Sequence, residues 1–141
     1  MSVRFVLLPL FVEVLLTFGV MFGMMYFRTS TLRRGETRLA DISLREPNWP
    51  RRATQFGYAF ANQFELPVLF YVLTILVIIT HHADLLFVLL AWIFVVMRIL
   101  QATVHVTNNN VRVRGAYYGV GALVLLIMWI IYIVRIMLAL P

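Results

Sequence analysis

The sequence predicts an all-α integral membrane protein, built as a bundle of four membrane-spanning helices. Hydrophobic residues make up 62% of its 141 positions, and its mean hydropathy of +0.91 excludes an ordinary soluble domain. Four apolar stretches are each long enough to cross a hydrocarbon layer of about 30 Å, which takes roughly 20 helical residues.

The expected spans are residues 5–27, 59–80, 85–106 and 116–140, and they form a single domain over residues 1–141. The first stretch begins with Arg4 and an apolar run, but Glu13 interrupts that run and no small-x-small cleavage site follows. We therefore interpret it as a retained membrane anchor and not as a cleaved signal peptide.

The connections between the spans differ in charge. Residues 28–58 contain seven arginines against three acidic residues, a net charge of +4. The third connection, residues 107–115, carries Arg112 and Arg114 without any acid, whereas the second has no arginine. Because arginine-bearing loops stay in the cytoplasm, we expect residues 28–58 and 107–115 to be cytoplasmic and both termini to lie outside.

A polar face descends along the second span. Pro47 and Pro50 end any helix before them, so we expect a helix to restart near Arg51 and continue into the membrane. Pro67 is expected to kink this helix just past the polar face. The face consists of Gln55, Tyr58, Asn62 and Glu65, at offsets of three, four and three.

The third span carries a matching polar face, with Arg98, Gln101 and His105 at offsets of three and four. Since Glu65 and Arg98 lie at similar depths, we expect them to pair. An ionisable group at membrane depth costs on the order of 3 kcal/mol, so it persists mainly beside a cavity or a partner charge. The pair marks either a functional site or a buried contact that only fixes helix register.

Two further groups of charged residues lie near the outer side. Glu13 and Arg135 are expected to form a structural pair, although Arg135 could instead extend to the interface. A metal site at His81, His82 and Asp84 is the less favoured reading, because adjacent histidines do not easily face one ion. Asp84 is well placed to cap the third span.

Missing residue types exclude several chemistries. Without cysteine, the chain has no disulfide, no thiolate metal site and no thiol nucleophile of its own. Without lysine, Schiff-base chemistry is excluded, and all twelve basic residues are arginines, which suit carboxylate and phosphate contacts.

Together these features resemble the MAPEG family, the membrane-associated proteins of eicosanoid and glutathione metabolism. The motifs are Asn62-x-x-Glu65 followed by Pro67, and Arg98-x-x-Gln101-x-x-x-His105 leading to Arg112 and Arg114. Residues 62–71 look like the short bacterial branch, and the resemblance covers nearly the whole chain. It implies a homotrimer in the bacterial inner membrane that binds glutathione at protomer interfaces near the cytoplasm.

The resemblance also implies residue roles. Glutathione is net anionic, so arginines around a cytoplasm-facing pocket would hold its carboxylates, and a nearby arginine would stabilise its thiolate. The implied catalytic residues are Arg112 and Arg114, without a choice between them. The implied glutathione-binding residues are Arg28, Arg51, Arg52, Tyr58, Asn62, Glu65, Arg98, Gln101 and His105.

Two departures from the family pattern keep the function open. Active members usually carry an arginine where this chain has Tyr58, and Gln101 and His105 replace tyrosines of the eicosanoid-forming members, which argues against a leukotriene-type activity. One hypothesis is a glutathione-dependent transferase or peroxidase acting on lipophilic electrophiles. The alternative is a non-catalytic scaffold or accessory subunit that binds a lipid or a larger membrane complex.

Two other functions are not favoured. The polar faces stop about halfway across the membrane, so one protomer offers no continuous aqueous path for a transporter. The arginines are explained by topology and by anionic lipid head groups, so nucleic-acid binding is not expected.

Overall fold

The computed structural model describes all 141 residues and contains helices but no strands. The elements are α1 (Val3–Arg33), the 3-10 helix η1 (Leu39–Asp41), α2 (Arg51–Asn62), α3 (Leu66–Ile79), α4 (Leu85–Val106) and α5 (Val111–Met137). Four segments are long and apolar enough to cross a membrane, namely α1, α2 together with α3, α4 and α5. The prediction of four membrane-spanning helices is confirmed.

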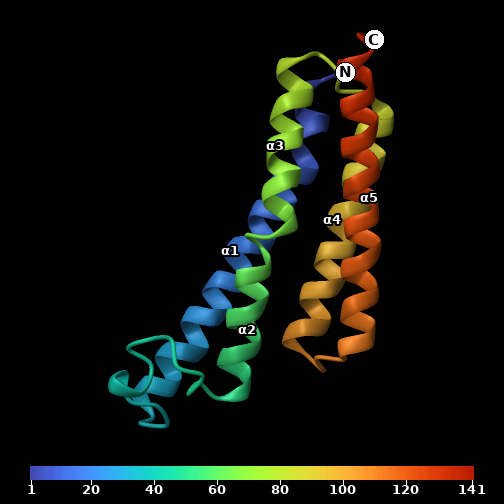
Figure 1. The fold of residues 1–141 in the computed structure, drawn as a ribbon. Coiled ribbons are helices and arrows are strands. Elements are labelled where there is room, and N and C mark those ends of the chain that lie inside the picture. The colour runs from blue at the N-terminus through green and yellow to red at the C-terminus, as the bar shows by residue number, and fades with distance from the viewer.

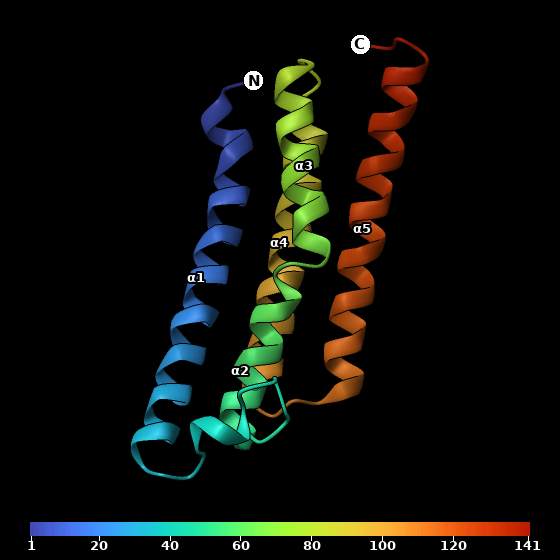
Figure 2. The ribbon, with the colours of Figure 1, turned by 60° about the vertical axis from the view of Figure 1, so that its left-hand side comes forward.

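The helices run along one common axis, and both chain termini lie at the same end of the bundle (Figure 1). The connection that contains η1 and the short connection between α4 and α5 lie at the opposite end (Figure 2). Helix α4 packs against α1, α2 and α5, while α3 packs against α1 and α5. The polar faces of α2 and α4 are therefore on neighbouring helices.

The apolar core lies in the half of the bundle that holds the termini. Phe70 on α3 and Phe94 on α4 are fully buried there, and their ring centres are 4.9 Å apart. Many outward-facing side chains are also apolar, for example Leu15 and Met137, as expected where helices face lipid. The complete core is Val6, Phe70, Leu73, Val77, Phe87, Val88, Ala91, Phe94, Val95, Leu125 and Met128.

The second span is broken into two helices. It begins at Arg51, as predicted, but α2 ends at Asn62 and α3 starts only at Leu66. The prediction of a kink just past the polar face is wrong in position, because Pro67 lies inside the first turn of α3. A proline is tolerated there since the first helical N–H groups have no partner within the helix.

Two helices extend beyond the spans that hydropathy predicts. Helix α1 continues past residue 27 to Arg33, and α5 begins at Val111 instead of residue 116. The Asn110 side chain accepts hydrogen bonds from the backbone N–H groups of Arg112 and Val113, which stabilises the early start of α5. Hydropathy marks the part of a helix that crosses the lipid, and polar residues extend both helices beyond it.

Asp84 connects α4 and α5 at the end of the bundle that holds the termini. Its side chain accepts from the N–H of Phe87 at 2.9 Å, so the predicted cap of α4 is confirmed. It also forms an ion pair with Arg135 at 2.7 Å. The predicted pair of Arg135 with Glu13 is therefore wrong. His82 is held separately, with its ring nitrogens 2.8 and 3.0 Å from the carbonyl oxygens of residues 80 and 140.

Helices α1 and α2 come very close at Gly23. A Cβ atom added there would overlap the ring of Phe56, which stacks on Phe27 with ring centres 5.0 Å apart. Only glycine fits this contact without a shift of the aromatic pair.

Candidate functional site

A cavity of about 330 Å³ opens between α2, α4 and α5, in the half of the bundle opposite the termini. We call it the polar cavity, because most of its lining side chains can donate or accept hydrogen bonds. Its volume falls within the range of small-molecule pockets. The lining residues are Tyr58, Asn62, Gln101, His105, Arg114, Gly115 and Tyr118.

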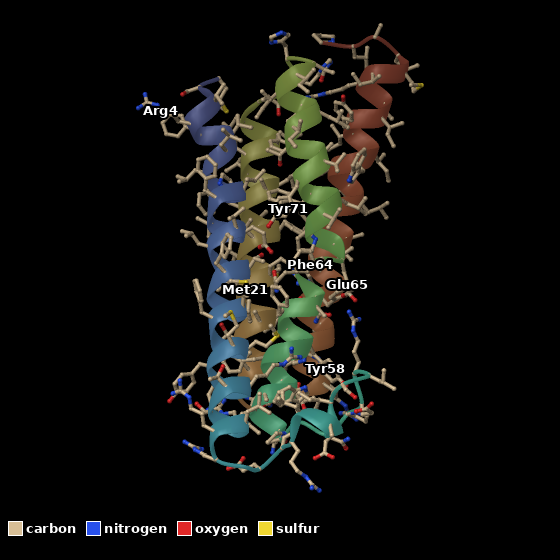
Figure 3. All side chains as sticks on the ribbon, turned by 90° about the vertical axis from the view of Figure 1, so that its left-hand side faces the viewer. Arg4, Met21, Tyr58, Phe64, Glu65 and Tyr71 are labelled. Atoms are coloured by element: carbon tan, nitrogen blue, oxygen red, sulfur yellow. The ribbon has the colours of Figure 1, made fainter.

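Each of the three helices contributes residues one turn apart. Tyr58 and Asn62 come from α2, Gln101 and His105 from α4, and Arg114 and Tyr118 from α5. Residues four apart share one helical face, so three parallel faces converge on the cavity. In Figure 3, Tyr58 lies in the lower half of the bundle, below Phe64 and Glu65 at the helix break.

Arg114 is held in place by the loop before α5. Its Nη1 atom donates to the Oδ1 atom of Asn109 at 2.7 Å. Asn109 has a φ of 54°, a left-handed conformation that asparagine adopts more readily than most residues. Of the two arginines implied as catalytic, Arg114 lines the polar cavity, whereas Arg112 is exposed and does not.

Arg98 lies behind the cavity wall and contacts three of the lining residues. Its side chain is fully buried. Its Nη1 atom donates to Oε1 of Gln101, and its Nη2 atom donates to the backbone carbonyl of Asn62 at 3.0 Å. Its guanidinium carbon is 5.8 Å from the centre of the Tyr118 ring, within range of a cation–π contact. Arg98 thereby ties together the three helices that line the cavity.

The predicted ion pair between Glu65 and Arg98 is wrong. Glu65 lies in the break between α2 and α3, where its side chain is exposed, and it forms no ion pair. The break offers Arg98 the carbonyl of Asn62 instead. That carbonyl also accepts from the backbone N–H of Glu65 at 3.3 Å, in place of the bond from four residues ahead that a continuous helix would supply.

His105 lines the cavity, and its hydrogen-bonding groups are unused. It is 3% exposed, and neither ring nitrogen has a partner. Its ring centre lies 6.4 Å from that of Tyr58 across the cavity. Because buried polar atoms are normally paired, these two nitrogens are unused hydrogen-bonding groups in the wall of the cavity.

The remaining residues implied by the resemblance lie outside the polar cavity. Arg28 stacks over the ring of Trp49 at 5.1 Å, and Arg52 donates to the carbonyl of Val106. Arg51 is exposed at the start of α2. These arginines stand at the loop end of the bundle, on the side where the cavity lies.

Sequence reasoning missed Gly115 and Tyr118. Tyr118 follows Arg114 by four residues, so the helical offset from a selected arginine is the signal that could have found it. Gly115 has no side chain, and nothing in the sequence distinguishes it from a packing glycine.

The comparisons with known proteins give one match. The model of the MAPEG family matches residues 6–134, which include every residue that lines the polar cavity. No curated protein and no solved structure matches the chain.

Proposed function

Because this chain belongs to the MAPEG family, we propose that its polar cavity binds glutathione and that the protein is a glutathione-dependent transferase or peroxidase for lipophilic electrophiles. The observation that carries the proposal is Arg114, a fixed cation within a cavity that also holds an amide-bearing asparagine and glutamine and an unpaired histidine.

The chemistry of the cavity fits this ligand. Glutathione carries two carboxylates, peptide amides and a thiol, and the chain has no cysteine of its own. Arg114 would stabilise the thiolate, since a nearby cation favours the charged form. In a transferase reaction, the thiolate sulfur forms a bond to an electrophilic carbon and the leaving group departs with its electron pair. Asn62, Gln101 and His105 would bind the peptide groups.

A second cavity supports a lipophilic co-substrate. It has a volume of about 430 Å³, lies between α3 and α5, and all its lining residues are apolar. Ala122 in this apolar cavity follows Tyr118 of the polar cavity by one turn of α5. An apolar substrate arriving through the lipid would thus approach the place proposed for the thiolate. The lining residues are Leu66, Leu69, Ala122, Leu125, Leu126, Trp129 and Ile133.

We propose further that the protein is a homotrimer in the plasma membrane, with the polar cavity at the protomer interface. Glu65 is exposed on a single protomer within the second span, and an ionised carboxylate facing lipid is unfavourable. A neighbouring protomer would cover it. The positive-inside rule favours a cytoplasmic location of the helix ends that carry Arg28, Arg51, Arg52 and Arg112, where these cations would attract anionic glutathione.

One observation favours a different function. Tyr58 occupies the lining position where an arginine is usual in active relatives, so one carboxylate contact is missing. A non-catalytic scaffold or accessory subunit, which binds a lipid or a larger membrane complex, would tolerate that loss.

Calorimetry with the purified protein in detergent tests the proposal. We expect saturable glutathione binding that weakens at least about tenfold in Arg114→Ala, because one charge-assisted contact contributes about 1.5–3 kcal/mol. Arg112→Ala is the matched control, since Arg112 lies outside the cavity. A folded wild type that binds no glutathione would refute the enzyme proposal and favour the accessory role.

If glutathione binds, aryl halides and organic hydroperoxides can then be tested as substrates. Formation of a thioether would identify a transferase, and formation of oxidised glutathione with an alcohol would identify a peroxidase.

A further inference from the structure

Glu13 is a buried acid that the proposed chemistry does not use. It lies on α1 within the first membrane-spanning segment and is fully buried. Neither of its carboxylate oxygens has a hydrogen-bond partner. A carboxylate in such a place has lost its hydration without gaining donors, which disfavours the ionised form.

The charged and titratable groups around Glu13 are few. Arg98 from α4 is the cation that acts on it electrostatically, although the two form no ion pair. Tyr71 from α3 is the other titratable neighbour, and it lies at mid-height of the bundle (Figure 3). Helix α2 presents no titratable group to Glu13, and the nearest polar residue on α1 is Thr17, whose hydroxyl donates to the Glu13 backbone carbonyl.

Arg98 connects this acid to the polar cavity. An arginine keeps its charge in proteins, and the two hydrogen-bond partners of Arg98, Gln101 Oε1 and the Asn62 carbonyl, are both neutral. Arg98 therefore acts electrostatically on Glu13 and is hydrogen-bonded to two of the residues that line the cavity. The pair is neutral when Glu13 is ionised, and it carries one positive charge when Glu13 is protonated.

We propose that Glu13 is a proton-binding site whose occupancy is coupled, through Arg98, to the binding of an anionic ligand in the polar cavity. This inference rests on the proposed function for the identity of the anion, glutathione or an analogue of it. An anion beside Arg98 interacts more favourably with the positively charged pair than with the neutral one. Ligand binding therefore draws a proton onto Glu13, and by linkage a lower pH strengthens ligand binding.

S-methylglutathione is the suitable probe, because it has the charges of glutathione but no thiol proton to release. Calorimetry in buffers of different protonation enthalpy measures how many protons accompany binding. We expect a net uptake that approaches one proton per protomer in the wild type, and an affinity that falls by up to about tenfold per pH unit across the titration of Glu13. In Glu13→Gln, both effects are expected to disappear.

His105 is the alternative acceptor, because it lines the cavity with two unpaired nitrogens. The control is His105→Gln. Proton uptake that remains in His105→Gln and vanishes in Glu13→Gln supports the inference. Uptake that persists in Glu13→Gln, or that vanishes only in His105→Gln, overturns it.

Infrared spectroscopy supplies a test that needs no ligand, with the band assigned to Glu13 by its absence from Glu13→Gln. A protonated carboxyl in an apolar site gives a carbonyl stretching band that is separate from the carboxylate bands. We expect this band in the ligand-free wild type to disappear as the pH rises. If S-methylglutathione does not bind, the proposed function fails, while a titrating band assigned to Glu13 still supports the proton site and its absence overturns it.

Discussion

Glu13 and Arg98 are both buried and interact electrostatically. We predict that removing the charge of Arg98 strongly lowers folding stability. Arg98→Met keeps much of the side-chain volume but removes the guanidinium. Three interactions are lost: the hydrogen bond to Gln101, the hydrogen bond to the Asn62 carbonyl, and the electrostatic contact with Glu13. Glu13 is then left as an isolated buried acid without a cation.

The magnitude follows from these contacts. A hydrogen bond to a charged group contributes about 1.5–3 kcal/mol, and Arg98 donates two of them. We therefore expect Arg98→Met to lower the free energy of unfolding by about 3–6 kcal/mol. Glu13→Gln in the same chain removes the isolated acid, so the double variant is expected to be more stable than the sum of the single effects by at least about 1 kcal/mol.

Equilibrium unfolding in mixed micelles of mild detergent and dodecyl sulfate, followed by circular dichroism, measures these differences. Arg135→Met serves as control, because it removes a partly exposed ion pair with Asp84 that is worth about 0–1 kcal/mol. If the effects of Glu13→Gln and Arg98→Met add to within about 0.5 kcal/mol, the two residues are not coupled and the reasoning is refuted.

Three further predictions concern other contacts. Gly23→Ala forces the Phe56 ring to move and is expected to lower the free energy of unfolding by about 1–3 kcal/mol, with partial recovery on adding Phe56→Leu. Asp84→Ala removes both the cap of α4 and the ion pair with Arg135, so it should destabilise by about 1 kcal/mol more than Asp84→Asn, which keeps a capping side chain. Tyr58→Arg adds a cation to the polar cavity and is expected to raise glutathione affinity about tenfold in calorimetry.

Each of these has a clear contrary result. An unchanged stability of Gly23→Ala would mean that α1 and α2 do not meet at this residue. Equal destabilisation by Asp84→Ala and Asp84→Asn would assign the effect to the ion pair alone. A Tyr58→Arg variant that binds glutathione no better than the wild type would argue against a ligand carboxylate near this position.

The fold was largely predictable because membrane spans are long and apolar. Hydropathy located the four spans, Pro50 indicated the helix that begins at Arg51, and Asp84 was recognised as a cap. Hydropathy indicates how deep a residue lies in the membrane, but it says little about the direction in which its side chain points around the helix axis. Glu13 and Arg135 were paired on depth alone, whereas the packing of the helices brings Arg135 to Asp84.

The candidate site was predictable in part from the spacing of its polar residues along each helix. Helical offsets correctly grouped Tyr58 with Asn62 and Gln101 with His105, since residues on one helical face stay together. The pairing of Glu65 with Arg98 failed because the helix stops before Glu65, and a break of three residues changes the direction of every side chain within it. The sequence did not indicate which of Arg112 and Arg114 lies at the site, and only the lining of the cavity distinguishes them.

The break in the second span also bears on how the chain enters the membrane. Helix α3 has 14 residues, about 21 Å of helix, which is too short to cross a hydrocarbon layer of about 30 Å. The missing length comes from α2, whose last carbonyl, that of Asn62, accepts a hydrogen bond from Arg98 of α4. Since α4 is synthesised after α3, we expect the second span to be held at its final depth only when the third arrives, so that membrane insertion and assembly of the polar cavity are completed together.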